Sequence, residues 1–126
     1  MASGYNQVIL IGNVKPNITI KPYRNDVKVW FYLEVEDLDY DPVYAKYRRH
    51  KELFRITFVG DRSIPFDFLL RQHKYIQVTG KLHIRTFKER MVSDKYVPCE
   101  IKTSPKNILL LDNINNGFEL TSFGAF

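Results

Sequence analysis

The sequence predicts an all-β domain, a small closed barrel of five strands with one helix between the third and fourth strands. Apolar and polar residues alternate with a period of two in several runs, most clearly from Val27 to Glu36. Gly80 interrupts the strand-like run from Lys74 to Phe87, and a strand that bends at a glycine can pass from one sheet to another. Only the stretch from Asp61 to Gln72 combines helical spacing with helix-end signals.

Length and composition indicate one globular domain, because the chain has 126 residues of which 44% are hydrophobic. We expect this domain over residues 1–112 and a short tail, mobile or docked, over residues 113–126. The net charge of +5 fits a polyanionic partner without requiring one. Cys99 is the only cysteine and the three histidines are scattered, so we expect no disulfide, metal or other cofactor. No apolar run is long enough for membrane insertion.

Other strands are expected wherever apolar runs are bounded by turn residues. The run from Asn6 to Gly12 is continuously apolar at its centre, so both of its faces are expected to be covered. Residues 22–26 are expected to form a turn, and residues 88–95 a charged hairpin connection. The remaining strands are predicted over residues 17–20, 53–60, 74–87, 96–103 and 108–111.

The single helix has recognisable end signals. Ser63 is a suitable N-cap, and Pro65 would lie in the first turn, where its missing N–H has no partner to lose. Phe66, Leu69 and Leu70 recur at helical spacing. We expect these apolar residues to close one end of the barrel.

The strand from Val27 to Glu36 has two contrasting faces. The face that is expected to lie in the core carries Val27, Val29, Phe31, Leu33 and Val35. The other face carries Trp30 and Tyr32, which is unusual for a solvated surface. Either these rings stack on nucleic-acid bases, or they pack against a second subunit, which is at least as common a use of surface aromatics.

The strand after Gly80 is a candidate nucleic-acid contact. Alternation places Lys81, His83, Arg85 and Phe87 on one face, which would offer cations for phosphates and a ring for a base. The alternative is an ordinary solvated strand face with a partly buried phenylalanine.

Residues 37–49 form the longest non-periodic stretch and are expected to be a loop. Its first part is acidic, and its second part is basic and aromatic. Lys46, Tyr47, Arg48 and Arg49 could clamp a single-stranded nucleic acid. Alternatively, the loop is self-paired and its acids neutralise its own cations.

Motifs for catalysis are absent from the sequence. It has no Walker loop, no nucleophile elbow, no paired His–Glu metal motif and no Cys–His constellation. We therefore expect a binding or scaffolding protein, and not an enzyme.

The order of motifs resembles the single-stranded DNA-binding proteins of bacteria and mitochondria, whose fold is the OB-fold. The start NQVILIGNV is similar to that family's first strand, and FRITFVG is similar to its third strand. FLLRQHKYIQVTGKLHIRTF is similar to its helix end and bent fourth strand, and YVPCEIKTSPKNILLLD to its closing strands. The resemblance covers about residues 5 to 112.

The resemblance implies a homotetramer that wraps single-stranded DNA. Phe87 corresponds to one of the family's stacking tryptophans, whereas two other stacking positions are occupied by Leu53 and Val59. Arg55 and Arg85 match basic positions, and His83 replaces another. Each stacked base contributes about 1–3 kcal/mol, so two lost rings would weaken binding unless Trp30 or the loop tyrosines compensate.

We expect a sequence-independent single-stranded DNA-binding protein for DNA maintenance. The residues expected on the DNA path are Phe87, Arg85, Lys81, His83, Lys88, Arg55, Lys46, Arg48, Arg49, Tyr47 and Trp30. The end GFELTSFGAF is short and barely acidic, which favours the mitochondrial matrix over a bacterial or phage cytoplasm. The main alternative is a structural subunit of a larger organellar or ribosomal complex. The hypothesis of an RNA-binding barrel of the cold-shock type is less favoured, because those barrels carry more aromatic side chains on adjacent strands.

Overall fold

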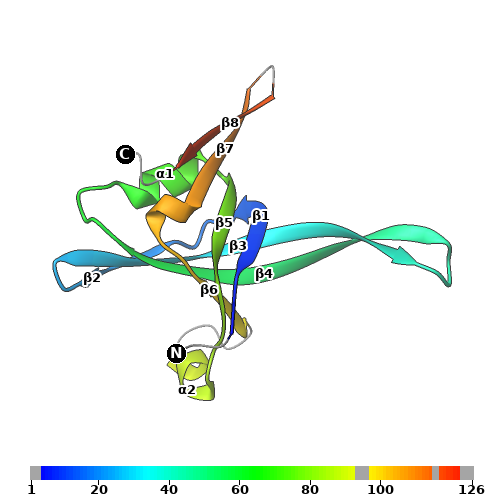
Figure 1. Cartoon of the computed structure of the whole chain (residues 1–126), viewed down its shortest axis with the longest axis horizontal. Coiled ribbons are helices and arrows are strands. Elements are labelled where there is room, and N and C mark those ends of the chain that lie inside the picture. The colour runs from blue at the N-terminus through cyan, green and yellow to red at the C-terminus, as the bar shows by residue number, and fades with distance from the viewer. Residues whose placement is uncertain (1–3, 93–96, 115–116, 123–126) are drawn as a thin grey trace.

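A closed ring of five strands forms the centre of the protein (Figure 1). The computed structural model describes residues 4–92, 97–114 and 117–122. The ring consists of β1 (Val8–Val14), β3 (Asp26–Asp41), β4 (Lys46–Gly60), β6 (Cys99–Lys102) and β5 (Tyr75–Ile84), which pairs back with β1. Its pairs are antiparallel except for the parallel pair β4–β6. This topology confirms the predicted OB-fold.

The helix α1 (Phe66–Gln72) lies between the third and fourth barrel strands, as predicted. It begins later than expected, because the Asp61 carboxylate accepts a hydrogen bond from the Ser63 amide at 2.8 Å and holds that segment in a turn. Ser63 is therefore not the N-cap, a position that Pro65 occupies. None of the helices in the described part of the chain has the length and apolar composition that a membrane crossing needs.

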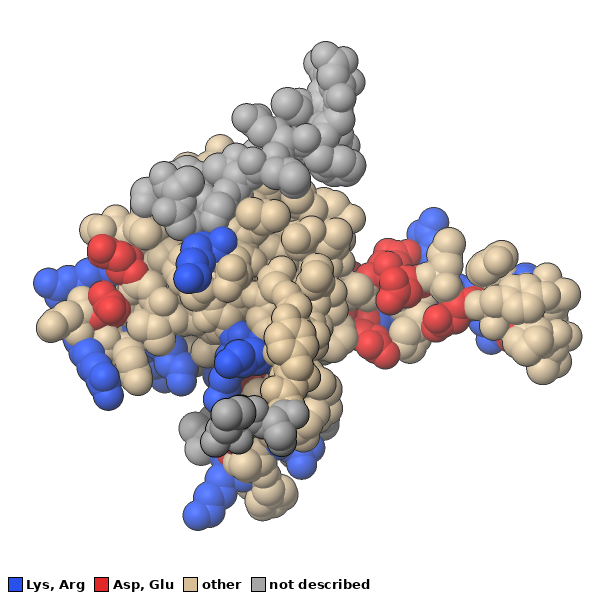
Figure 2. Space-filling model, in the orientation of Figure 1, with Lys and Arg blue, Asp and Glu red and all other residues tan. Residues whose placement is uncertain are grey.

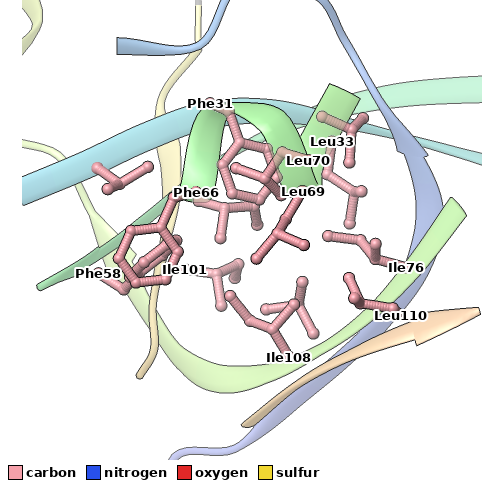
Figure 3. Packing of buried hydrophobic residues seen from close by; sticks show 14 residues of the cluster. Phe31, Leu33, Phe58, Phe66, Leu69, Leu70, Ile76, Ile101, Ile108 and Leu110 are labelled. Atoms are coloured by element: carbon pink, nitrogen blue, oxygen red, sulfur yellow. The ribbon is translucent and has the colours of Figure 1, made fainter. Parts of the chain in front are cut away.

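The core is formed by the inward faces of the strands and by α1. Phe31 and Leu33 of β3 are fully buried, as the alternation predicts. Figure 3 shows Phe66, Leu69 and Leu70 of α1 lying against this cluster from one end of the barrel. The predicted role of the helix in closing the barrel is thereby confirmed.

Further elements extend the ring. β2 (Thr19–Tyr23) pairs with β3 through a tight turn, so the predicted turn over residues 22–26 is shorter than expected. β7 (Ile108–Ile114) pairs with β5 after a 3-10 turn (Pro105–Asn107), and β8 (Gly117–Ser122) pairs with β7. Part of the predicted tail is thus a strand. Its last residues, 123–126, lie outside the described residues, and the division at residue 112 stays a prediction.

Gly80 is the point at which β5 changes partners. Up to Gly80 the strand pairs with β1, and from Lys81 onward it pairs with β6. A Cβ atom on Gly80 would lie only 2.6 Å from the backbone oxygen of Lys102. The bend and the close backbone approach that the sequence predicted are both present.

The predicted loop over residues 37–49 is wrong. β3 and β4 stay paired from the barrel out to Asp41 and Lys46, and only residues 42–45 form a turn. We call this projecting ribbon, residues 34–53, the arm (Figure 1). Both faces of the arm are solvated towards its end, where Leu38 is exposed, so no apolar alternation marks these strands in the sequence.

Candidate nucleic-acid interface

The outward side chains of four barrel strands line up in two rows across the sheet. Cross-strand pairing connects β3, β4, β6 and β5 in this order. The first row is Trp30, Thr57, Lys102 and Lys81. The second row is Tyr32, Arg55, Glu100 and His83. Residues from distant parts of the chain therefore share one face, opposite to the core-facing side chains.

A groove of about 890 Å³ lies over this face, between β2 and the short helix α2 (Phe87–Val92). Its acidic lining residues are Glu89 and Glu100. Its cationic lining residues are Lys21, Lys28, Arg55, Arg85, Lys88 and Lys102. The four lysines form no ion pair with any residue that the structure describes. The groove thus combines an excess of positive charge with an aromatic side chain, Trp30.

Trp30 is half-buried in the groove, with two cations over its ring. Lys21 of β2 places its Nζ 5.3 Å from the ring centroid, and Arg55 of β4 places its Cζ at 4.8 Å. β2 and β4 flank β3, so both cations reach the ring from neighbouring strands. Such cation–π contacts favour a fixed ring orientation.

Arg55 and Glu100 form a buried ion pair in the floor of the groove. The distance from Arg55 Nε to Glu100 Oε2 is 2.8 Å, and both side chains are almost fully buried. The Thr57 hydroxyl donates to the same carboxylate oxygen at 3.0 Å. Arg55 thus lies in the groove, with its charge compensated by Glu100, and its place on a DNA path stays a prediction.

The segment after β5 differs from the sequence prediction. The strand ends at Ile84, so Arg85 and Phe87 do not continue the face of Lys81 and His83. Arg85 is only 4% exposed and donates hydrogen bonds to the carbonyl oxygens of Val97 (2.8 Å) and Glu89 (3.1 Å). Its guanidinium is therefore engaged with the backbone.

Phe87 was predicted to end the strand, and residues 88–95 to form a hairpin connection. Instead α2 begins at Phe87, because Thr86 and Glu89 form a capping box. The Thr86 hydroxyl accepts a hydrogen bond from the Glu89 amide (3.2 Å), and the Glu89 carboxylate accepts one from the Thr86 amide (3.1 Å). Phe87 is 70% exposed and does not line the groove, whereas its neighbour Lys88 does. Residues 93–96 of the predicted connection lie outside the described residues.

Glu89 links the helix cap to the strand face. His83 Nε2 lies 3.2 Å from Glu89 Oε2. Hydrogen bonds from the Thr86 amide, from His83 and from the Thr86 hydroxyl lower the pKa of Glu89 to about 2. Glu89 is therefore a fixed negative charge at the α2 side of the groove at any ordinary pH.

One set of metal-ligand types occurs in the described part of the chain. The donor atoms of His83, Glu89 and Glu100 lie within 4.8 Å of one another. Each already has a contact in the protein, since Glu100 is paired with Arg55 and Glu89 holds the cap and His83. A cation there would compete with the Arg55 guanidinium, so this set is a poor metal site.

The arm does not contribute its predicted residues to the groove. Lys46, Tyr47, Arg48 and Arg49 lie towards the far end of the ribbon, away from the barrel (Figure 1). Its cations are held on the arm itself, by the ion pairs Arg48–Asp41 (3.0 Å), Arg49–Glu36 (3.4 Å) and Lys51–Glu34 (3.8 Å). Acidic side chains gather along it (Figure 2). These ion pairs agree with the self-paired alternative, and the nucleic-acid clamp stays a prediction.

Tyrosine rings cover the end of the arm. Tyr40 and Tyr47 face each other across the strands with centroids 5.3 Å apart. Lys46 and Arg48 lie over the ring of Tyr44, at 5.7 Å and 5.0 Å from its centroid. The charges of this tip are therefore directed at its own rings.

Three groove lysines were missed by the sequence prediction of the site, namely Lys21, Lys28 and Lys102. Lys28 and Trp30 are two positions apart on one strand, so their side chains point to the same face. This spacing alone could have identified Lys28 as a neighbour of Trp30. The other two join the groove only through cross-strand register. Lys81, by contrast, was predicted and lies at the end of the first row, just outside the groove lining.

Comparison with known proteins supports the fold assignment. A comparison with protein-family models gives no match, and neither does one with the sequences of curated proteins. Among solved structures, the chain is similar to the SSB of Plasmodium falciparum in complex with ssDNA. That match has 20% identity and a TM-score of 0.61, and it covers 97% of each chain. The chain has the OB-fold of single-stranded DNA-binding proteins.

Two bacterial structures with this fold are also similar. The small single-stranded DNA-binding protein of Streptomyces coelicolor matches with 17% identity and a TM-score of 0.51, over 80% of this chain and 88% of that one. A deletion mutant of the Thermus aquaticus single-stranded DNA-binding protein matches with 19% identity and a TM-score of 0.60. That match covers 94% of this chain but only 56% of the Thermus aquaticus chain.

Proposed function

We propose that this protein binds single-stranded DNA without sequence preference, in the groove between β2 and α2. The observation that carries the proposal is Trp30, an aromatic ring set in a groove where cations outnumber acids. A ring that stacks on any base, beside cations that contact phosphates, suits a single strand of any sequence. The fold shared with single-stranded DNA-binding proteins supports this assignment.

Within the groove, the residues divide into two roles. Lys21, Lys28, Lys88 and Lys102 contact phosphates, because no carboxylate of the described residues neutralises them. Trp30 stacks on a base, which requires Lys21 to move aside from its ring. We propose binding and not catalysis, since stacking and counterion release suffice for this function.

The biological setting follows from the same proposal. We propose a role in DNA replication, repair or maintenance, a homotetrameric assembly and a mitochondrial location. Native mass spectrometry of the protein isolated from its source tests the assembly. A homotetramer supports the proposal, whereas a stoichiometric place in a hetero-complex supports the alternative of a structural subunit.

A fluorescence titration tests the binding function directly. Trp30 is the only tryptophan, so its emission reports on the groove alone. We expect dT oligonucleotide to quench this emission, with an affinity that falls steeply as salt is added. A duplex of the same length is the control and should bind more weakly. Undetectable or salt-independent binding of the single strand would contradict the proposal.

A further inference from the structure

We propose that Glu100 is a positioning residue for DNA binding, which holds Arg55 against the ring of Trp30. The inference rests on the proposed function for its binding test, but its structural part is measurable in the DNA-free protein. It has an unusual consequence, because a negative charge in the floor of a DNA groove would then strengthen the binding of a polyanion.

The geometry of the Arg55–Glu100 pair is fixed by the barrel. Arg55 on β4 lies opposite Glu100 on β6 in the parallel pairing of these strands. The 2.8 Å contact between Arg55 Nε and Glu100 Oε2 is buried on both sides, and Thr57 donates to the same oxygen at 3.0 Å. Backbone register, burial, the ion pair and the hydrogen bond from Thr57 together leave the carboxylate little freedom to move.

Arg55 in turn lies over the ring of Trp30. The Arg55 Cζ lies 4.8 Å from the centroid of Trp30, and a planar guanidinium stacks well on an aromatic ring. An arginine held in this position keeps Trp30 oriented before DNA arrives. Since the ring is already ordered, stacking on a base costs less conformational entropy.

The sign of the effect on DNA binding distinguishes repulsion by Glu100 from positioning by Glu100. If groove carboxylates acted only through repulsion of phosphates, removing either one would tighten DNA binding. If Glu100 acts through Arg55, removing its charge loosens the guanidinium and weakens binding. Glu89 is the matched control, because it lines the same groove and its contacts are with Thr86 and His83. The substitution Glu89→Gln also preserves the capping box.

The test compares Glu100→Gln with Glu89→Gln in titrations with a dT oligonucleotide at fixed salt. We expect Glu100→Gln to bind about three-fold to ten-fold more weakly, which corresponds to the loss of part of one stacking contact. Glu89→Gln should bind as tightly as the parent or more tightly. Unchanged or tighter binding by Glu100→Gln would overturn the inference.

A double-mutant cycle shows whether Glu100 acts through Arg55. In an Arg55→Met background, Glu100→Gln should no longer weaken binding, because the positioned guanidinium is already absent. An equal loss in both backgrounds would mean that Glu100 acts independently, and would contradict the proposal.

Acrylamide quenching of Trp30 provides a readout without DNA. Glu100→Gln should raise the quenching constant, because the guanidinium no longer covers the ring, whereas Glu89→Gln should leave it unchanged. If the parent protein binds no DNA, the proposed function fails, but this measurement still decides the positioning role. If Glu100→Gln does not fold, Thr57→Val removes only the hydrogen bond from the Thr57 hydroxyl to Glu100 and should also raise quenching. No rise in quenching would overturn the inference.

Discussion

Thr86 and Glu89 exchange reciprocal hydrogen bonds between their side chains and backbone amides, and this pair starts α2 where the barrel strand β5 has just ended. The same carboxylate contacts His83 on β5. A local capping motif therefore fixes α2, which borders the groove, to the barrel strand β5.

This relationship predicts a carboxyl group that titrates far below its usual range. The pKa of Glu89 is lowered from 4.5 to about 2, chiefly by the Thr86 amide and then by His83. Because the folded pKa is the lower one, its contribution to stability is fully present above pH 4.5 and is lost as the pH falls towards about 2. An NMR titration of the side-chain carboxyl carbons should give this midpoint. A midpoint near 4.5 would show that the contacts are absent in solution.

Gly80→Ala should destabilise the barrel at its bend. The added Cβ would lie 2.6 Å from the Lys102 carbonyl oxygen and 2.7 Å from the Ile101 side chain. We expect a loss of about 2–3 kcal/mol in the free energy of unfolding, measured by urea denaturation. Gly4→Ala is the matched control, since nothing lies within 4 Å of its added Cβ. Equal stabilities of the two variants would show that β5 and β6 are not in close contact there.

The groove lysines should matter more for DNA binding than the arm arginines. Lys28→Gln combined with Lys102→Gln removes two groove cations that form no ion pair among the described residues. The slope of log affinity against log salt should then fall by about 1.4. Arg48→Gln combined with Arg49→Gln removes the same charge, but both arginines are held by arm carboxylates. Less than half of that change is therefore expected. The opposite ranking would assign the DNA path to the arm.

Trp30→Ala should weaken single-stranded DNA binding by about ten-fold to one hundred-fold, which is the range of one stacked base. Phe87→Ala should have a smaller effect, because Phe87 projects from α2 outside the groove lining. Anisotropy of a labelled dT oligonucleotide measures both variants. A larger loss of DNA affinity for Phe87→Ala than for Trp30→Ala would indicate that Phe87 is the main stacking residue, as the resemblance implies.

Much of the barrel was predictable from the sequence, because burial on one face leaves a period of two. Phe31 and Leu33 alternate with Trp30 and Tyr32, and the structure places the first pair in the core and the second outside it. Gly80 was informative because the close approach of two backbones leaves no room for a side chain.

The arm and the groove were harder to predict for different physical reasons. Beyond the barrel, β3 and β4 have no core to face, so their strands carry no apolar period and were interpreted as a loop. The groove depends on register between β3, β4 and β6, which joins Trp30 to Lys102 across the sheet. No local pattern encodes that pairing. The α2 helix was missed although Thr86 and Glu89 have capping-box spacing, since a short charged segment was interpreted as a connection.

The first barrel strand, β1, pairs mainly with β5, a strand that lies much later in the sequence. β1 pairs with β3 only at Asn13 and Val14, but with β5 from Val8, opposite Gly80, to Asn13. During synthesis on the ribosome, the backbone groups of this apolar strand therefore lack their β5 partners until most of the chain has emerged. Such distant pairings slow folding, and an unsatisfied strand edge invites association between nascent chains. The N-terminal strand is thus the part of this protein that most needs protection before the ring closes.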